Sequence, residues 1–122
     1  MSPEQIQKIR SDLSVTQTNM TILSDMLTEL SPGREHQEDR TLLEQLHGTC
    51  RAMQSRLVEL IDQVDDDHLT ADLLEVNDNM NNIFLRWDQV RVTALALLLI
   101  SDIYVQYIII LLSCQYVSPS QV

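Results

Sequence analysis

The side chains that most often do chemistry are few in this 122-residue sequence: three histidines, two cysteines and a run of three aspartates. His36, His47 and His68 lack the i, i+4 spacing with which a helix presents two histidines to one metal ion. The run Asp65–Asp67 lacks the alternating ligands, central glycine and terminal glutamate of a calcium-binding EF-hand loop, which favours a solvated acidic loop. Cys50 lies on an apolar stripe with no basic residue placed to activate it, which favours a buried structural thiol. We therefore expect no enzymatic activity, no metal site and no cofactor.

Charge and composition exclude two further classes of function and divide the chain. The formal net charge of -10 argues against nucleic-acid binding, because phosphates select basic surfaces. With only two glycines, the chain has no glycine-rich phosphate-binding loop. All basic residues and all but one of the acidic residues lie in 1–91, whereas Asp102 is the only charged residue of 92–122. We therefore treat 1–91 and 92–122 as two separate regions.

The polar region opens with a predicted amphipathic helix. Ser2 can cap it and Gln5 can close a capping box, while Ser31-Pro32-Gly33 ends it. Its apolar stripe repeats at alternating intervals of three and four residues, which is the helical period. The members of this stripe are Ile6, Ile9, Leu13, Thr16, Met20, Leu23, Leu27 and Leu30.

Two further helices follow with the same period. The second begins near Gln37–Asp39, and the third follows the acidic loop with Asp67 or Thr70 as its cap. The second stripe consists of Leu42 or Leu43, Leu46, Cys50, Met53, Leu57, Leu60 and Val64, and the third of Leu73, Val76, Met80, Ile83, Trp87 and Val90. Three helices of about 20 to 28 residues with short connections predict an all-α fold, an antiparallel three-helix bundle.

One feature exceeds what this core needs. The first helix carries a second apolar row beside its stripe, formed by Val15, Ile22 and Met26 with Asn19 between them. The second helix likewise offers Leu42, Leu43 and Leu46. Two interpretations remain: a wide buried face, or a shallow apolar docking strip bordered by acidic side chains. In the second case the border consists of Asp25, Glu29, Asp39 and Glu44, and it suits an apolar partner with a basic rim.

Four segments together resemble a known family. They read Ser-Pro-Glu-Gln-Ile at 2–6, Met-Leu-Thr-Glu-Leu at 26–30, Thr-Cys-Arg-Ala-Met-Gln at 49–54 and Val-Asn-Asp-Asn-Met-Asn-Asn-Ile-Phe-Leu-Arg at 76–86. Their order and spacing resemble the GAT domain of the Target-of-Myb (Tom) family over 2–88. Residues 19–26 are more distantly similar to the GAT domain of the Golgi-localised, gamma-ear-containing, Arf-binding adaptors.

The resemblance implies a module that binds ubiquitin and a Tollip-like adaptor during the sorting of ubiquitinated cargo at endosomes, in the cytoplasm. It places the main site between the first two helices, at Asn19, Ile22, Asp25, Met26, Asp39, Leu42, Gln45 and Leu46. The upstream VHS domain, the Arf-binding helical hook and the clathrin-binding tail of such families have no counterpart here. We therefore expect neither Arf nor clathrin as a partner.

The apolar region supports several interpretations. Residues 92–117 contain 20 apolar residues among 26 positions, and 94–114 are long enough to cross a bilayer. Eleven Leu and Ile residues at about -0.5 kcal/mol each outweigh Asp102 at about +2.5–3.5 kcal/mol. A membrane anchor with the bundle in the cytosol is one interpretation. The others are a fourth helix packed on the bundle, a strand-forming segment, and an extension outside the family domain that was never selected to fold.

Overall fold

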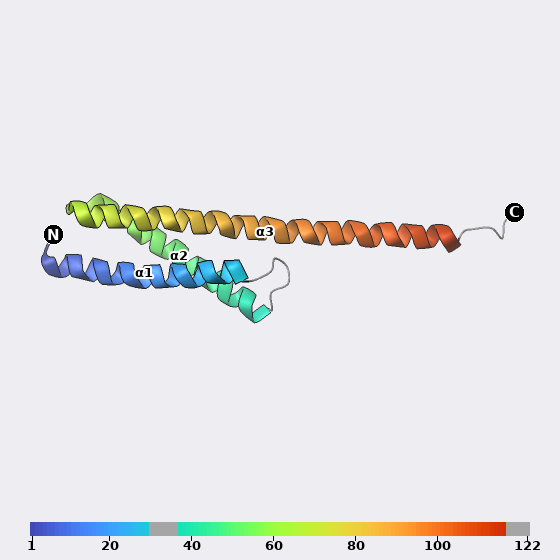
Figure 1. Ribbon diagram of the computed structural model, residues 1–122, viewed down its shortest axis with the longest axis horizontal. Helices are drawn as coiled ribbons and strands as arrows, with labels where there is room; N and C mark the ends of the chain where they lie inside the picture. Colours follow the sequence, from blue (N-terminus) through green and yellow to red (C-terminus); the bar gives the residue numbers. More distant parts are fainter. Residues whose placement is uncertain (30–36, 117–122) are drawn as a thin grey trace.

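A computed structural model describes residues 1–29 and 37–116 of the chain. It contains three helices, α1 (Pro3–Glu29), α2 (Gln37–Gln63) and α3 (Asp67–Tyr116), and no strand among those residues. Figure 1 shows α1 and α3 starting at the same end and running in the same direction, while α2 runs in the opposite direction and crosses both in this view. Each helix contacts both others. The predicted all-α, antiparallel three-helix bundle is thus confirmed.

The start of α1 is fixed by the predicted capping box. The Ser2 backbone N–H donates to Gln5 Oε1 at 2.9 Å, and the Gln5 N–H donates to Ser2 Oγ at 3.2 Å. These reciprocal bonds pair amide groups that a helix start leaves without intrahelical partners. The predicted stop at Ser31-Pro32-Gly33 lies outside the described residues.

The cap of α3 differs from the prediction. Neither Asp67 nor Thr70 caps this helix; instead Asp66 Oδ1 accepts from the Leu69 backbone N–H at 2.9 Å. The helix begins at Asp67, so Asp66 is the last residue before it and its carboxylate reaches the third helical amide. Thr70 instead donates its hydroxyl to the Asp66 carbonyl at 2.9 Å. Three consecutive aspartates made the position of the cap ambiguous by one residue.

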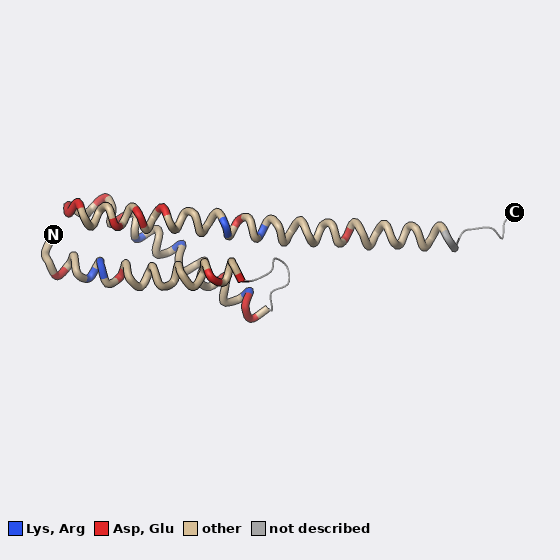
Figure 2. The backbone as a smooth tube through the Cα atoms, in the orientation of Figure 1, with Lys and Arg blue, Asp and Glu red and all other residues tan. Residues whose placement is uncertain are grey.

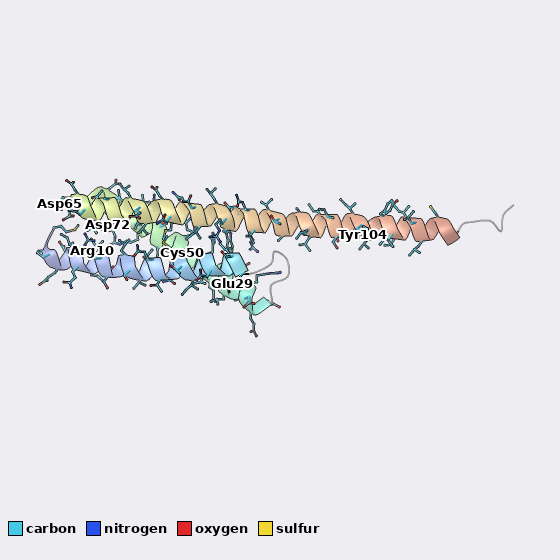
Figure 3. All side chains as sticks on the ribbon, in the orientation of Figure 1. Arg10, Glu29, Cys50, Asp65, Asp72 and Tyr104 are labelled. Carbon is cyan, nitrogen blue, oxygen red and sulfur yellow. The ribbon has the colours of Figure 1, made fainter. Side chains whose placement is uncertain are left out.

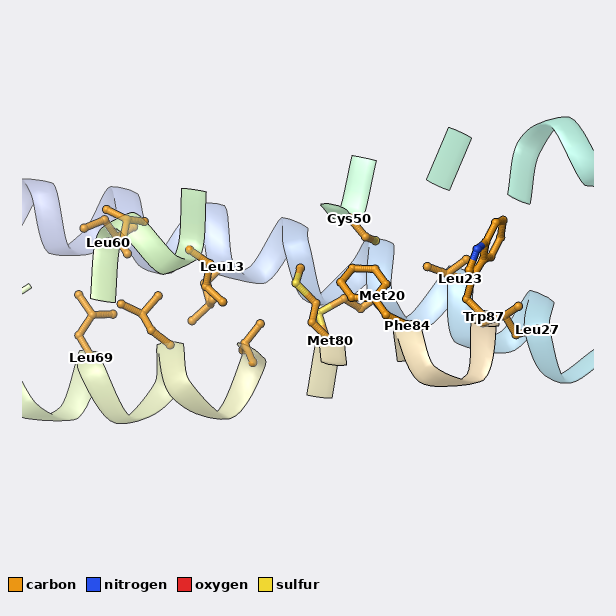
Figure 4. Close-up of a cluster of buried hydrophobic side chains, with 14 of the residues drawn as sticks. Leu13, Met20, Leu23, Leu27, Cys50, Leu60, Leu69, Met80, Phe84 and Trp87 are labelled. Atoms are coloured by element: carbon orange, nitrogen blue, oxygen red, sulfur yellow. The ribbon is translucent and has the colours of Figure 1, made fainter. Parts of the chain in front are cut away.

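The buried side chains follow the predicted stripes. Cys50 and Trp87 are buried as expected, and Leu43 rather than Leu42 faces the core. Figure 4 shows side chains of all three helices meeting along the bundle axis. The stripes missed Leu69 and Phe84, which lie four residues from the predicted core positions 73 and 80 on the same helical face. The buried apolar set is Ile9, Leu13, Met20, Leu23, Leu27, Leu43, Cys50, Leu57, Leu60, Leu69, Leu73, Val76, Met80, Phe84 and Trp87.

The length of α3 corrects the sequence-based expectation of helices no longer than about 28 residues. This helix has 50 residues and continues past the bundle through residues 92–114, which we call the extension. No proline or glycine interrupts it. Every extension residue except half-buried Ala94 is exposed. The strand-forming and packed-fourth-helix interpretations are therefore wrong, because the extension is helical and projects away from the bundle.

Polar contacts fix the relative rotation of the helices. Arg10 Nη1 lies 2.8 Å from Asp72 Oδ2, joining the first parts of α1 and α3 (Figure 3). Further along, the Arg86 guanidinium donates to Ser24 Oγ at 2.7 Å and to Thr28 Oγ1 at 2.6 Å. These residues therefore mark the side of α1 that faces α3.

Candidate functional site

The side of α1 that faces α2 is marked by a groove. Its volume is about 270 Å³, and its lining combines apolar residues of both helices with the charged residues Asp12 and Arg56. Val15 of α1 and Met53 of α2 contribute to it. The groove lies at the Val15 end of the predicted apolar row. Sequence reasoning did not find it, because the pairing of Val15 with Met53 depends on how far the two antiparallel helices are displaced along each other.

The predicted row on α1 continues along that same side. Residues 15, 19, 22 and 26 are three or four positions apart, so they share one face of the helix. Val15 lines the groove toward α2, whereas Ser24 and Thr28 bond to Arg86 of α3. Ile22 is 44% exposed, and Met26 is half-buried against the core. The row therefore borders α2 and is open to solvent.

The apolar residues Leu42 and Leu46 lie on the side of α2 that faces α1. His47 and Gln54 contact α3, His47 through Trp87 and Gln54 through hydrogen bonds to Asn77 and Asn81. Leu42 and Leu46 share their face instead with Met53, which lines the groove toward α1. Leu42 is 46% exposed, whereas Leu46 is half-buried against the core.

We call Ile22, Met26, Leu42 and Leu46 the apolar strip. Both pairs border the junction between α1 and α2, in the half of the bundle from which α3 continues outward (Figure 1). Each pair combines one exposed and one half-buried side chain. This arrangement offers apolar area that is held in place by the core and still accessible to a partner.

The polar residues predicted for the site lie at different depths. Asn19 is half-buried, and its side-chain amide donates to the Val15 carbonyl at 2.9 Å. Asp25 is exposed and also lines the groove between α1 and α3, so it borders Ile22 on the side away from α2. Asp39 is half-buried one turn before buried Leu43, and exposed Gln45 adjoins Leu42. The negative charges beside the strip are therefore those of Asp25 on α1 and of Asp39 at the start of α2.

A histidine that the sequence left without a role has the most unusual surroundings. The His47 ring stacks on Trp87 with centroids 4.0 Å apart and meets the Phe84 ring edge-on at 5.5 Å. Its Nε2 is buried and has no hydrogen-bond partner among the described residues. Burial, and next the positive charge of Arg51, lower the pKa of His47. The cluster of His47, Phe84 and Trp87 joins α2 to α3. It lies on the side of α2 that faces α3, whereas the apolar strip lies on the side that faces α1.

Chemistry beyond binding has little support in the described residues. Burial raises the pKa of the Cys50 thiol, which disfavours the thiolate that a nucleophile needs. Within 1–29 and 37–116, no group of three or more His, Cys, Asp and Glu side chains could hold a metal ion. What the geometry offers is an accessible apolar surface with acidic neighbours.

Known proteins match the part of the chain that forms the bundle. The model of the GAT domain family matches residues 17–91. Human "TOM1-like protein 2" is 50% identical over 86 residues, which cover 70% of this chain and 17% of that protein. The chicken "Target of Myb1 membrane trafficking protein" is also 50% identical over 86 residues, with the same coverage. Human "TOM1-like protein 1" is 38% identical over 87 residues, 71% of this chain and 18% of that protein.

The similarity ends where the bundle ends. The family model stops at residue 91, one position before the extension. The chain spans about 17% of the length of each of the two relatives that are 50% identical to it. More than half of the chain is nevertheless matched by the family model. The chain therefore belongs to the GAT domain family, as its sequence motifs predicted.

Proposed function

We propose that the bundle is a binding module for ubiquitin and for a Tollip-like adaptor, and that it serves the sorting of ubiquitinated cargo at endosomes. The observation that carries this proposal is the apolar strip, in which Ile22 and Leu42 are almost half exposed although they adjoin the core. A monomeric bundle gains nothing in solution from such exposure, whereas a partner surface can cover it.

The chemistry of the strip selects the partner. Its centre is aliphatic, and Asp25 and Asp39 lie beside it. All but one of the acidic residues of this -10 chain belong to the bundle, and Figure 2 shows them distributed over its three helices. A small protein with an apolar patch and a basic rim fits this surface, because its charges steer the encounter while the apolar contact supplies affinity. Ubiquitin is the partner of this kind that the resemblance implies.

Family membership supports the cellular setting. Two of the relatives carry the printed name "Target of Myb1 membrane trafficking protein", and the match to the GAT domain model covers residues 17–91. We therefore place the bundle in the cytoplasm and at endosomes, as a non-enzymatic adaptor module. We assign the Tollip-like adaptor to the same strip, because the resemblance implies one main binding site between the first two helices.

The proposal is tested by titrating the isotope-labelled chain with ubiquitin and following its backbone amide signals by nuclear magnetic resonance. We expect the largest shifts at the strip residues and at Asn19 and Gln45. Replacing both Ile22 and Met26 by alanine should weaken binding at least several-fold, because it removes the aliphatic side chains of α1 from the contact.

A matched control separates the strip from exposed apolar area in general. Leu74 and Leu85 are also exposed on the bundle, but both belong to α3. The double substitution Leu74→Ala and Leu85→Ala should leave ubiquitin binding unchanged. Equal weakening by both pairs, or binding that survives loss of Ile22 and Met26, would contradict the assignment of the strip.

A further inference from the structure

The extension is the largest exposed apolar surface of the molecule. Its large apolar side chains range from 38% exposed at Ile108 to 69% exposed at Ile103. Figure 3 shows these side chains projecting from the helix along its length beyond the bundle, including that of Tyr104. Asp102 is the only charged residue of the extension, most of which is drawn in tan in Figure 2. Removing this much apolar surface from water is strongly favourable, so we ask what covers the extension.

The distribution of apolar residues identifies what covers the extension. A protein groove or a second copy of the helix would bury one face, and the opposite face would then be polar. Here residues 97–100 are consecutive Leu, Leu, Leu and Ile, which point in four different directions around the helix. Leu99 and Ile108 lie on opposite faces, and both are exposed. Only surroundings that are apolar on all sides satisfy this pattern.

The length of the extension agrees with a lipid bilayer. Its 23 residues span about 34 Å as a helix, against about 30 Å of hydrocarbon. Buried core helices of soluble proteins can be as long and as apolar, but every residue of this segment except half-buried Ala94 is exposed. We propose that residues 92–114 cross a lipid bilayer as a single helix that continues α3 and holds the bundle at the membrane surface.

Asp102 is compatible with this arrangement because of its position. Asp102, Gln106 and Ser113 are four and seven residues apart, so their polar groups share one narrow face of the helix. Outside this face the extension carries two further small polar side chains, Thr93 and Ser101, and is otherwise apolar. Polar atoms within membrane helices are tolerated on such a face, where they meet water or another polar group.

The continuity of α3 determines where the membrane lies relative to the bundle. Glu44 of α2 pairs with Arg91 at 2.8 Å, and His47 stacks on Trp87, so the start of α2 is level with the last bundle turns of α3. These turns lie within about 8 Å of residue 92 along the helix. A partner on the apolar strip would thus bind at the membrane surface. That consequence rests on the proposed function, whereas membrane insertion itself does not.

The chain carries its own reporter of topology. Of its two free cysteines, Cys50 is buried in the bundle and Cys114 is exposed at the far end of the extension. The experiment is cell-free synthesis of the full chain with preformed phosphatidylcholine vesicles, followed by flotation, carbonate extraction and labelling with a membrane-impermeant maleimide. We expect carbonate-resistant flotation that high salt does not weaken, because insertion into neutral lipid needs no charge. Cys114 should be protected until detergent is added.

Three controls make the result decisive. In a Cys114→Ser chain, Ser55→Cys places an exposed thiol on the bundle, which should be labelled without detergent. Leu99→Arg and Ile108→Arg should each abolish carbonate-resistant flotation, since a spanning helix is covered on both faces. Leu74→Arg with Leu85→Arg makes the same chemical change on the bundle and should leave flotation intact.

Several outcomes would overturn the proposal. Cys114 labelled as readily as the bundle thiol means that the helix does not cross. Release by carbonate or by salt means surface binding only. A soluble dimer that tolerates one of Leu99→Arg and Ile108→Arg means that a second copy covers one face. None of these outcomes affects ubiquitin binding by the bundle, so failure of this proposal and failure of the proposed function are distinguishable.

Discussion

The two parts of α3 share one uninterrupted helical backbone and have opposite surroundings. From Asp67 to Arg91 the apolar residues recur every three or four positions, with polar residues between them, and that face is buried against α1 and α2. From residue 92 to residue 114 the apolar residues surround the helix, and all of them except half-buried Ala94 are exposed. The difference shows that apolar content alone does not produce a core. A core needs a face that is apolar and a partner element that presents a complementary face.

The largest expected effect comes from making one substitution in both parts of α3. Leu73 is fully buried, so Leu73→Ala should lower the free energy of unfolding by about 2–5 kcal/mol through lost burial and a cavity. Leu99→Ala should change it by less than about 0.5 kcal/mol, because the Leu99 side chain has no packing partner in the bundle. Urea unfolding followed by fluorescence of Trp87, the only tryptophan, measures the bundle alone. Equal effects would show that the extension packs on the bundle.

A second comparison uses polar side chains. Arg86→Ala removes hydrogen bonds from a charged donor to Ser24 and Thr28, so it should cost about 1–3 kcal/mol of bundle stability. Gln106→Ala on the extension should leave the same unfolding transition unchanged. Arg91→Ala, which removes an exposed ion pair, should fall between them at about 0–1 kcal/mol. An Arg86 effect no larger than that of Arg91 would mean that the Arg86 hydrogen bonds do not stabilise the contact between α1 and α3.

A third comparison concerns helix propensity. Gly48 lies within α2, is exposed, and an added methyl group would meet no atom within 4 Å. Gly48→Ala should therefore stabilise the bundle by about 0.5–1 kcal/mol in urea unfolding. The reverse change in the extension, Ala96→Gly, should leave Trp87-detected unfolding unaffected. A loss of bundle stability on Ala96→Gly would reveal that the two parts of α3 unfold together.

The last comparison is the pH dependence of the bundle. Because the folded state lowers the pKa of His47, the unfolded chain takes up its proton first as pH falls. The stability that neutral His47 contributes is fully present above the pKa that this histidine has in the unfolded chain. It is lost as the pH falls from that value toward the lower pKa of His47 in the folded protein. His47→Gln should remove this part of the dependence of the free energy of unfolding on pH, measured by urea unfolding between about pH 7.5 and 5.5. His68→Gln at an exposed position is the matched control, and an identical slope in both variants would contradict the role of His47.

Sequence periodicity predicted most of the bundle because each stripe is set by local spacing. The capping box at Ser2 and Gln5, the buried Cys50 and the buried Trp87 were all readable in this way. Asp66 was missed as the cap of α3 because three adjacent aspartates offer the same side chain. That the extension continues α3 was not predicted, although a helical extension was among the interpretations, because uniform apolarity does not show where one helix ends and the next begins.

The candidate site was predictable to a smaller extent. The residues themselves indicated the second row on α1 and the apolar residues Leu42, Leu43 and Leu46 on α2, and the resemblance added Gln45. Its relation to the groove at Val15 and Met53, the orientation of Asp25 toward the side away from α2, and the cluster around His47 were not predictable. Each depends on how two helices are rotated and displaced against each other, which no local pattern records.

By itself the sequence determined the family, the three helical stripes and the separation of an acidic region from an apolar one, because these depend on residue types and their spacing along the chain. Tertiary structure decided which of Leu42 and Leu43 is exposed, which helix pairs with which, and that the apolar region continues α3 instead of folding back. Those outcomes depend on the competition between partner surfaces in space. A side chain is buried only when another element supplies the surface that covers it.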